Sequence, residues 1–275
     1  MENKLPKVAL MYDFDKTLCT TSMQEYTFIP SLGESAESFW SEVNELSEQE
    51  KMDPILTYMY VMIRKSKDKH KPISKDVFKS CGKDIEFFPG VPEWFERINA
   101  FGRECGVDVE HFIISSGLRE IIEGSRIADR FKQIYACEFH YDENGVADWP
   151  NVAVNYTTKT QFLFRINKGA FHVWDDTRVN EYVPEAERRV PFKNMIYIGD
   201  GLTDVPCMKL VKVYGGQSIA VYQNDRDEVA RQLLADDRVN FPARADYTCG
   251  SELDLLVKDI IRKIAAVCRL EAHSR

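Results

Sequence analysis

Two aspartates, Asp13 and Asp15, stand at the end of a short apolar segment and are followed by Thr17. The apolar segment, residues 7–12, predicts a buried strand of a parallel sheet. On a straight strand the two carboxylates point to opposite faces, but in a turn that leaves the strand they can converge on one cation. Hard oxygen ligands of this kind suit Mg²⁺. The alternative is that the aspartates cap a helix, and the segment taken alone slightly favours that interpretation.

A second segment ends an apolar strand, residues 111–115, in the hydroxyl of Ser115. It continues as Ser116, Gly117 and Leu118, and we expect this small-residue turn to open a helix. Hydroxyl and backbone N–H groups at a helix N-terminus form a phosphate cradle. An ordinary serine N-cap also explains the pattern.

A third segment places Asp200 between Gly199 and Gly201, directly after the apolar residues 195–198. Asp204 follows four residues later. The glycines permit a ligand to approach the backbone closely. The two carboxylates can supply a metal ligand and a group that orients the ligand shell. A simple Gly-Asp-Gly turn accounts for the glycines but not for Asp204.

A cation for such a site is available in Lys159, which precedes the apolar helical run that begins at Phe162. Lys168 is a competitor for the same position. Nothing in the local sequence separates Lys159 from an ordinary solvated lysine, so both lysines stay open from the residues alone.

In this order, each after a strand, Asp-x-Asp-x-Thr and Gly-Asp-Gly-x-Thr-Asp resemble the haloacid dehalogenase (HAD) superfamily of phosphotransferases. The resemblance covers roughly residues 8–221. A helical insert after the first motif, Phe88-Pro89-Gly90 and the Ser115–Arg119 run are similar to the phosphoserine-phosphatase-like branch. That branch usually has glycine where Ser116 stands.

The resemblance implies that Asp13 is the nucleophile of an aspartyl-phosphate mechanism. Asp15 then protonates the leaving oxygen and later activates water. Because a halide leaves without a proton, the carboxylate of Asp15 favours phosphoryl transfer over dehalogenation. The implied phosphoryl-binding groups are Thr17, Ser115, Ser116, Gly117 and Lys159. The implied Mg²⁺ ligands are the Asp13 side chain, the Asp15 backbone carbonyl and Asp200, supported by Gly201 and by Asp204, which holds Lys159 or a metal-bound water.

The alternation of buried strands and helical patterns predicts an α/β fold, a doubly wound Rossmann-like parallel sheet. Residues 22–84 look all-helical and predict a cap inserted after the first strand, with residues 1–21 and 85–275 forming the core domain. The Asn144-Gly145 step predicts a hairpin within residues 137–154. The expected elements are strands at 7–12, 111–115, 195–198 and 218–221, and helices at 35–48, 54–65, 74–81 and 91–101.

The bulk composition of the 275 residues is that of a globular protein with 44% hydrophobic residues and a formal net charge of −8. This sign argues against a nucleic-acid partner. We find no apolar run long enough for a membrane span and no signal peptide, which predicts a cytoplasmic protein with no membrane partner. The seven cysteines are scattered, which argues against a disulfide framework and against structural zinc.

The sequence therefore predicts a Mg²⁺-dependent phosphatase that hydrolyses a small phosphorylated metabolite. A cap inserted after the first motif favours small substrates over macromolecules. Two alternatives stay open: a phosphotransferase or phosphomutase of the same superfamily, and a non-catalytic signalling protein that is phosphorylated on Asp13. The identity of the substrate and the oligomeric state are left open.

Overall fold

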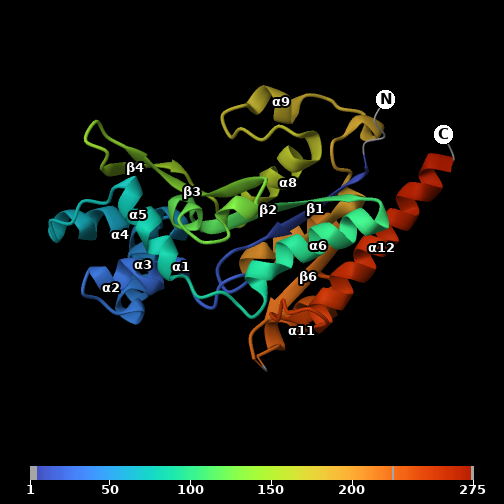
Figure 1. Cartoon of the computed structure of the whole chain (residues 1–275). Helices are drawn as coiled ribbons and strands as arrows, with labels where there is room; N and C mark the ends of the chain where they lie inside the picture. Colours follow the sequence, from blue (N-terminus) through green and yellow to red (C-terminus); the bar gives the residue numbers. More distant parts are fainter. Residues whose placement is uncertain (1–4, 225, 274–275) are drawn as a thin grey trace.

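A seven-stranded sheet runs through the described part of the chain, residues 5–224 and 226–273 of a computed structural model (Figure 1). The strands lie in the order β4-β3-β2-β1-β5-β6-β7, and every neighbouring pair is parallel except β3 and β4. The strands are β1 (Lys7–Tyr12), β2 (Asp108–Leu118), β3 (Gln133–Tyr141), β4 (Ala147–Val152), β5 (Met195–Gly199), β6 (Gln217–Tyr222) and β7 (Phe241–Arg244). The predicted doubly wound α/β sheet is confirmed, with one antiparallel edge strand.

The central strands are apolar throughout because both of their faces are covered. All five residues of β5 and the last five of β1 are buried. Such strands have no polar alternation, which is why continuous apolar runs identified them. The helices outside the insert are α6 (Val91–Cys105), α7 (Arg119–Glu123), α8 (Lys159–Lys168), α9 (Asp176–Asn180), α10 (Val205–Val213), α11 (Glu228–Ala235) and α12 (Glu252–His273). Single 3₁₀ turns are η1 (Gly82–Asp84), η2 (Ala128–Arg130), η3 (Glu185–Glu187), η4 (Phe192–Asn194) and η5 (Leu202–Asp204).

The chain changes direction across the sheet between β1 and β5. From β1 it crosses through α6 to β2 on one side, and from β5 it crosses through α10 to β6 on the other. Right-handed crossovers in opposite directions place α6 and α10 on opposite faces of the sheet. The carboxyl ends of β1 and β5 therefore border the crevice in which open α/β sheets bind ligands.

The segment between β1 and α6 is helical, as its sequence predicts (Figure 1). It contains α1 (Met23–Tyr26), α2 (Phe28–Ser31), α3 (Ala36–Glu50), α4 (Pro54–Asp68) and α5 (Lys75–Cys81). The three longest of these helices begin at side-chain caps, in which Ser35, Asp53 and Ser74 accept backbone N–H groups. Each cap satisfies donors that a helix start leaves free. The limits of a separate cap domain, residues 22–84, stay a prediction.

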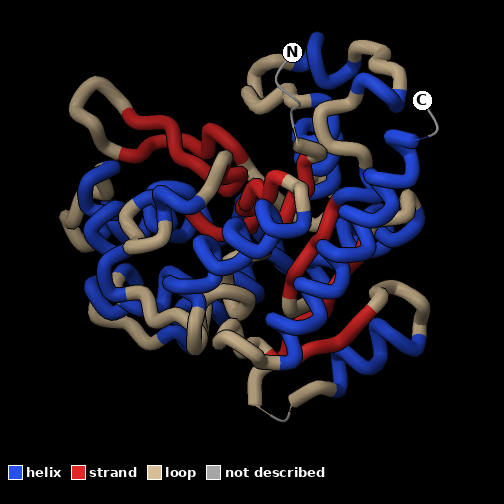
Figure 2. Tube along the Cα trace, turned by 45° about the vertical axis from the view of Figure 1, so that its right-hand side comes forward, coloured by secondary structure: helices blue, strands red, loops and turns tan. Residues whose placement is uncertain are grey.

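The predicted hairpin forms from β3 and β4, with Gly145 in the left-handed region at φ 72°. It lies beside the helical insert in both views (Figures 1 and 2). The N–H of Ala147 donates to the carbonyl of Ile73 over 2.8 Å, and the ring of Phe78 stacks on Phe139 at 5.6 Å. The insert therefore packs against a strand pair from the core as well as over the sheet edge.

Three features differ from the sequence prediction. Strand β2 continues to Leu118, so Ser116 and Gly117 are extended and do not form a turn that opens a helix. The reason is that Leu118 pairs with Cys137 of β3 after a register shift, and α7 begins only at Arg119. The short edge strand β7 and the long helix α12 had no predicted counterpart.

Candidate functional site

Two predicted site residues, Asp13 and Asp200, directly follow neighbouring strands at one edge of the sheet. Asp13 comes directly after β1 and its N–H donates to the carbonyl of Ile198 in β5, at 2.9 Å. Asp200 comes directly after β5. One carboxylate oxygen each from Asp13, Asp200 and Asp204 lies within 4.8 Å of the other two. The carboxyl ends of parallel strands thus bring these acids into one cluster.

The first motif leaves β1 in a tight turn. Leu18 donates its N–H to the carbonyl of Phe14 at 2.9 Å, and Lys16 has a positive φ of 56°. No α-helix begins before Met23 in this described segment, so the alternative of an aspartate pair that caps an adjoining helix is not found. The turn is the geometry in which two carboxylates spaced by one residue can approach the same ligand.

Lys159, the first residue of α8, is fully buried inside the acid cluster. Its Nζ lies 2.7 Å from Oδ1 of Asp204 and 3.1 Å from Oδ1 of Asp13. Burial alone lowers the pKa of a lysine, yet the charges of Asp13 and Asp204 raise the pKa of Lys159 above its usual value. Lys168, the competitor, donates instead to backbone carbonyls of Val179 and Glu181. The structure therefore places Lys159 among the acids and Lys168 elsewhere.

Asp204 is held by several donors. Its Oδ1 accepts from Lys159 and from the hydroxyl of Tyr197 at 2.8 Å, and its Oδ2 accepts from the N–H of Gly201 at 3.4 Å. A Cβ at Gly199 would lie 2.5 Å from Oδ2 of Asp204. Glycine before Asp200 therefore gives the Asp204 carboxylate the space to lie against the backbone.

Asp15 is oriented from the helical insert. Its Oδ1 accepts the N–H of Met23, the first residue of α1, at 2.8 Å. Burial and the charge of Asp13 raise the pKa of Asp15 to about 7. A carboxyl group with a pKa near neutrality can both give and take a proton at physiological pH.

The hydroxyl-bearing residues surround the acids. Thr17 is buried, and its Oγ1 donates to Oδ1 of Asp200 at 3.5 Å. Ser115 is buried and its Oγ accepts the N–H of Gly117 at 3.0 Å. The Oγ of Ser116 is buried without a partner among the described residues, while its carbonyl accepts the Tyr58 hydroxyl from α4 at 2.8 Å. A helix of the insert thus contacts the segment predicted to bind phosphate.

The cluster carries more negative charge than its described cations balance. Burial, followed by the charge of Asp204, raises the pKa of Asp13 to about 6, and burial and Asp13 hold the pKa of Asp200 well above its usual range. The buried Oδ1 of Asp13 has no well-directed hydrogen-bond donor among the described residues. Both oxygens of Asp204 accept hydrogen bonds, from Lys159, Tyr197 and Gly201, so Asp13 and Asp200 are the better candidates to bind a cation. The cluster therefore fits a metal ion.

Sequence reasoning missed Tyr197, Met23 and Tyr58. Tyr197 carried a weak signal, because a tyrosine inside a strand buried on both faces needs a partner for its hydroxyl. Met23 and Tyr58 belong to the insert, and their contacts with Asp15 and Ser116 come from folding of distant segments against each other. No local pattern reports such contacts.

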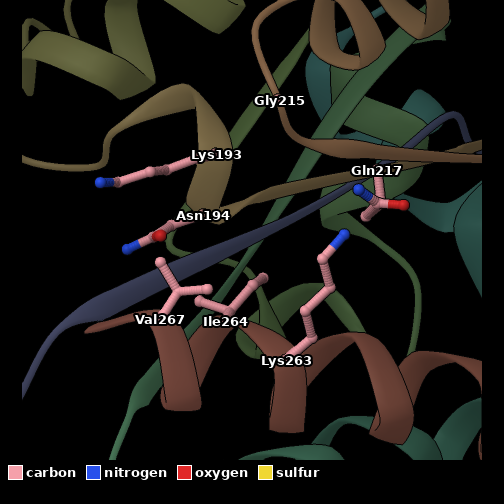
Figure 3. A pocket seen from close by; sticks show the side chains of 7 residues that line it. All are labelled: Lys193, Asn194, Gly215, Gln217, Lys263, Ile264 and Val267. Carbon is pink, nitrogen blue, oxygen red and sulfur yellow. The ribbon is translucent and has the colours of Figure 1, made fainter. Parts of the chain in front are cut away.

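A separate cavity of about 200 Å³ lies at the opposite edge of the sheet (Figure 3). Its lining comes from α12 and from the segments that lead into β5 and β6. The lining residues are Lys193, Asn194, Gly215, Gln217, Lys263, Ile264 and Val267. None of the predicted site residues is among them. The acid cluster, and not this cavity, is therefore the candidate active site.

No helix in the described residues is long and apolar enough to cross a membrane. Comparisons with known proteins show the family and the fold. A model of haloacid dehalogenase-like hydrolases matches residues 10–209. An uncharacterized protein of Borreliella burgdorferi is 30% identical over 279 residues, which cover 90% of this chain and 93% of that protein.

Two solved structures share the fold at low sequence identity. A HAD family hydrolase from Salmonella enterica serovar Typhi has a TM-score of 0.58 at 18% identity, over 93% of this chain and 72% of the other. A substrate-bound phosphoserine phosphatase has a TM-score of 0.57 at 13% identity, over 92% of this chain and 98% of the other. At these identities the likeness shows the fold alone. With the family match over residues 10–209, it follows that the chain belongs to the haloacid dehalogenase-like hydrolases.

Proposed function

We propose that the protein is a Mg²⁺-dependent phosphomonoesterase that acts on a small phosphorylated metabolite, with Asp13 as the nucleophile. The observation that carries the proposal is a division of tasks between two carboxylates of one motif. Asp13 lies 3.1 Å from the buried ammonium of Lys159, whereas Asp15 accepts the N–H of Met23 from α1 at 2.8 Å. One group is suited to attack and the other to proton transfer.

In the first step a carboxylate oxygen of Asp13 attacks phosphorus, and the bond from phosphorus to the ester oxygen breaks. Protonated Asp15 gives its proton to that leaving oxygen, so an alcohol departs and Asp15 becomes a carboxylate. The product on the protein is an aspartyl-phosphate. A solved structure of phosphoserine phosphatase with the same fold contains an analogue of a phospho-aspartyl intermediate, at 14% identity and a TM-score of 0.55.

In the second step the carboxylate of Asp15 takes a proton from water, and the resulting hydroxide attacks phosphorus. The bond between phosphorus and the Asp13 oxygen breaks, which releases inorganic phosphate and restores the Asp13 carboxylate. Asp15 is again protonated, so the cycle is balanced in atoms and protons. A pKa near 7 keeps both forms of Asp15 accessible at neutral pH.

Charge neutralisation is the main task of the surrounding groups, because a phosphate dianion repels a carboxylate nucleophile. Lys159 supplies one positive charge beside Asp13. Asp13 and Asp200 would hold Mg²⁺, with the Asp15 carbonyl as the further predicted ligand. When bound, the cation neutralises charge on the nucleophile and on the phosphoryl oxygens. Two carboxylates with room for substrate oxygens and water are the set that Mg²⁺ favours.

The phosphoryl oxygens are proposed to bind Thr17, Ser115, Ser116, Gly117 and Lys159. The extended backbone at Ser116 and Gly117 replaces the predicted helix start, so the donors there are individual N–H and hydroxyl groups and not a helix N-terminus. The buried, unpartnered Oγ of Ser116 supports its part in binding. The contact of Tyr58 with the Ser116 carbonyl supports a substrate small enough to fit beneath the insert.

The test is hydrolysis of a panel of small phosphate esters, including p-nitrophenyl phosphate, by the purified protein with Mg²⁺. We expect phosphate release by the wild type and its loss in Asp13→Asn, since an amide is not a competent nucleophile. Asp259→Asn is the matched control, because Asp259 is 70% exposed and pairs with Arg262 on the surface of α12. The phosphatase proposal fails if the wild type turns over no ester.

Adding a series of alcohols to the same assay separates hydrolysis from transfer. A phosphatase releases one phosphate for each alcohol leaving group at every acceptor concentration. If a phosphorylated acceptor accumulates in place of phosphate, the protein is a phosphotransferase. A protein that becomes stably phosphorylated on Asp13 without turnover would instead be a signalling protein.

A further inference from the structure

A buried phenol contacts the acid that holds the site lysine. Tyr197 lies in β5 and is 0% exposed. Its hydroxyl donates to Oδ1 of Asp204 at 2.8 Å, and this same oxygen accepts Lys159 Nζ at 2.7 Å. The phenol, the carboxylate and the ammonium therefore form a chain that ends at Asp13, whose Oδ1 is 3.1 Å from Lys159 Nζ.

In this hydrogen-bonded series, the Lys159 ammonium lies between two carboxylates, those of Asp204 and Asp13. Attraction between charges grows as the distance and the local dielectric constant fall, and all three groups are buried. The shorter distance is to Asp204, so this acid draws Lys159 away from the proposed nucleophile. The Tyr197 hydroxyl is a second donor to Asp204 Oδ1. It weakens the hold of this oxygen on Lys159 and fixes the orientation of the carboxylate.

We propose that Tyr197 is a positioning residue, which acts through Asp204 to keep the Lys159 ammonium against Asp13 and the phosphoryl group. The inference rests on the proposed function, because its effect is on the same reaction. Tyr197 touches neither nucleophile nor leaving group in this arrangement. Its removal leaves Asp204 with Lys159 as its one side-chain donor among the described residues and shifts the ammonium toward Asp204.

If the Tyr197 ring only fills space, removal of its hydroxyl should leave kcat unchanged. A second buried tyrosine provides the comparison: Tyr135 is 2% exposed, stacks on Phe162 of α8 at 4.4 Å, and has no hydrogen-bond partner for its hydroxyl among the described residues. Tyr135→Phe therefore removes a buried hydroxyl beside the same helix without removing a bond to Asp204.

The kinetic test compares Tyr197→Phe with Tyr135→Phe. For Tyr197→Phe we expect kcat to fall roughly tenfold with KM within about twofold, since an ammonium shifted toward Asp204 neutralises less charge in the transition state. Tyr135→Phe should keep the wild-type kcat. Equal rates in wild type and Tyr197→Phe would overturn the inference.

A double-mutant cycle tests whether the effect passes through Asp204. In an Asp204→Asn background, measured as the single-turnover rate of p-nitrophenol release, Tyr197→Phe should change the rate by less than about twofold. The same tenfold loss in both backgrounds means that Tyr197 acts by packing and overturns the inference.

Crystal structures of wild type and Tyr197→Phe give a readout that needs no turnover. We expect Lys159 Nζ within hydrogen-bonding distance of both Asp13 and Asp204 in wild type, and of Asp204 only in the variant. An unchanged Lys159 position contradicts the inference even in a protein that hydrolyses no ester, whereas an inactive wild type with a shifted Lys159 contradicts only the proposed function.

Discussion

Carboxylates with shifted pKa values occur in two regions of the molecule, and the shifts have opposite directions. At the junction of α6 and α12, Asp254 is fully buried and accepts from Arg97 Nε at 3.0 Å, from Lys258 Nζ at 2.7 Å and from the N–H of Gly250 at 2.9 Å. Burial raises the pKa of Asp254, but the bonds from Lys258, Gly250 and Arg97 outweigh it and hold this pKa below its usual value.

At the carboxyl edge of the sheet, burial outweighs the hydrogen bonds and the positive charge that lower the pKa of a carboxyl group. The pKa values of Asp13, Asp15 and Asp200 all lie above the usual range, with burial as the largest cause. The ammonium of Lys159 is shared between Asp13 and Asp204. Aspartates are therefore neutralised where they support the fold and incompletely neutralised where a cation and a phosphate ester are expected. This difference separates a structural acid from a candidate catalytic one.

The largest expected effect is that of replacing Asp15, which tests whether the incompletely neutralised acids take part in the reaction. Asp15→Asn keeps the shape of the side chain but can neither give nor take a proton. For alkyl phosphates we expect kcat to fall about 10²–10⁴-fold. p-Nitrophenolate leaves without a proton, so on that ester the variant should release one equivalent of product in a burst and then turn over slowly.

Quench-flow measurement of p-nitrophenol checks this expectation. The burst reflects formation of the aspartyl-phosphate, and the slow phase reflects its hydrolysis without a base. A variant that loses the burst and the slow phase equally on both ester types would show that Asp15 is not the proton-transfer group.

The next effect concerns the structural acid. Asp254→Asn leaves Arg97 and Lys258, whose side chains are 20% and 15% exposed, without their counter-charge. We expect the free energy of unfolding to fall by about 2–4 kcal/mol. Urea denaturation measures it, with Asp259→Asn as the surface control, expected to stay within about 0.5 kcal/mol.

A value for Asp254→Asn within the control range would remove the distinction between the two regions. It would mean that the bonds around Asp254 only offset the cost of burying its charge.

Asp254 and Asp15 are expected to change stability with pH in opposite directions, because folding lowers the pKa of Asp254 and raises that of Asp15. Asp15 has a folded pKa of about 7 against an ordinary value of 3.8. The folded state therefore binds more protons between these values, and its stability falls as pH rises from about 4 to about 7. His111, whose pKa burial lowers to about 3, has the opposite trend up to about pH 6.5, so a difference between variants is needed.

In EDTA, the free energy of unfolding of the wild type minus that of Asp15→Asn should fall by about 3–4 kcal/mol between pH 4 and pH 8. The His111 contribution is common to both proteins and cancels. A difference that stays constant across this range would show that folding does not raise the pKa of the Asp15 carboxyl group.

The smallest effect is stabilisation by the metal. A ligand of the folded state stabilises it by RT ln(1 + [L]/Kd), so Mg²⁺ at ten to thirty times its Kd should add about 1–2 kcal/mol. Thermal unfolding should show this shift in wild type and in Asp259→Asn, but not in Asp13→Asn or Asp200→Asn. An equal shift in all four proteins would place the Mg²⁺ away from the acid cluster.

Much of this arrangement can be predicted from the sequence because it depends on strand ends. Asp13 and Asp200 each directly follow an apolar strand, and the carboxyl ends of adjacent parallel strands lie side by side. The resemblance to the HAD superfamily favoured Lys159 over Lys168, because Lys159 precedes an apolar helical run, a choice that the local residues left open.

What could not be predicted depends on contacts between distant segments. Ser116 is extended because Leu118 pairs with Cys137, and no feature of residues 115–119 encodes that pairing. The hydrogen bond of Met23 to Asp15 and that of Tyr58 to Ser116 depend on how the insert folds onto the core. The hydroxyl of Tyr197 finds Asp204 only because Gly199 leaves space for the carboxylate.

The central claim is that Asp13 forms a covalent bond to phosphorus. The most direct measurement is mass spectrometry of the protein quenched in acid during turnover of p-nitrophenyl phosphate with Mg²⁺, followed by digestion. We expect one phosphoryl group on the peptide that contains Asp13, and none on that peptide in Asp13→Asn. An active enzyme in which this peptide stays unmodified at every quench time, or in which the phosphoryl group lies on Ser115, would contradict this assignment.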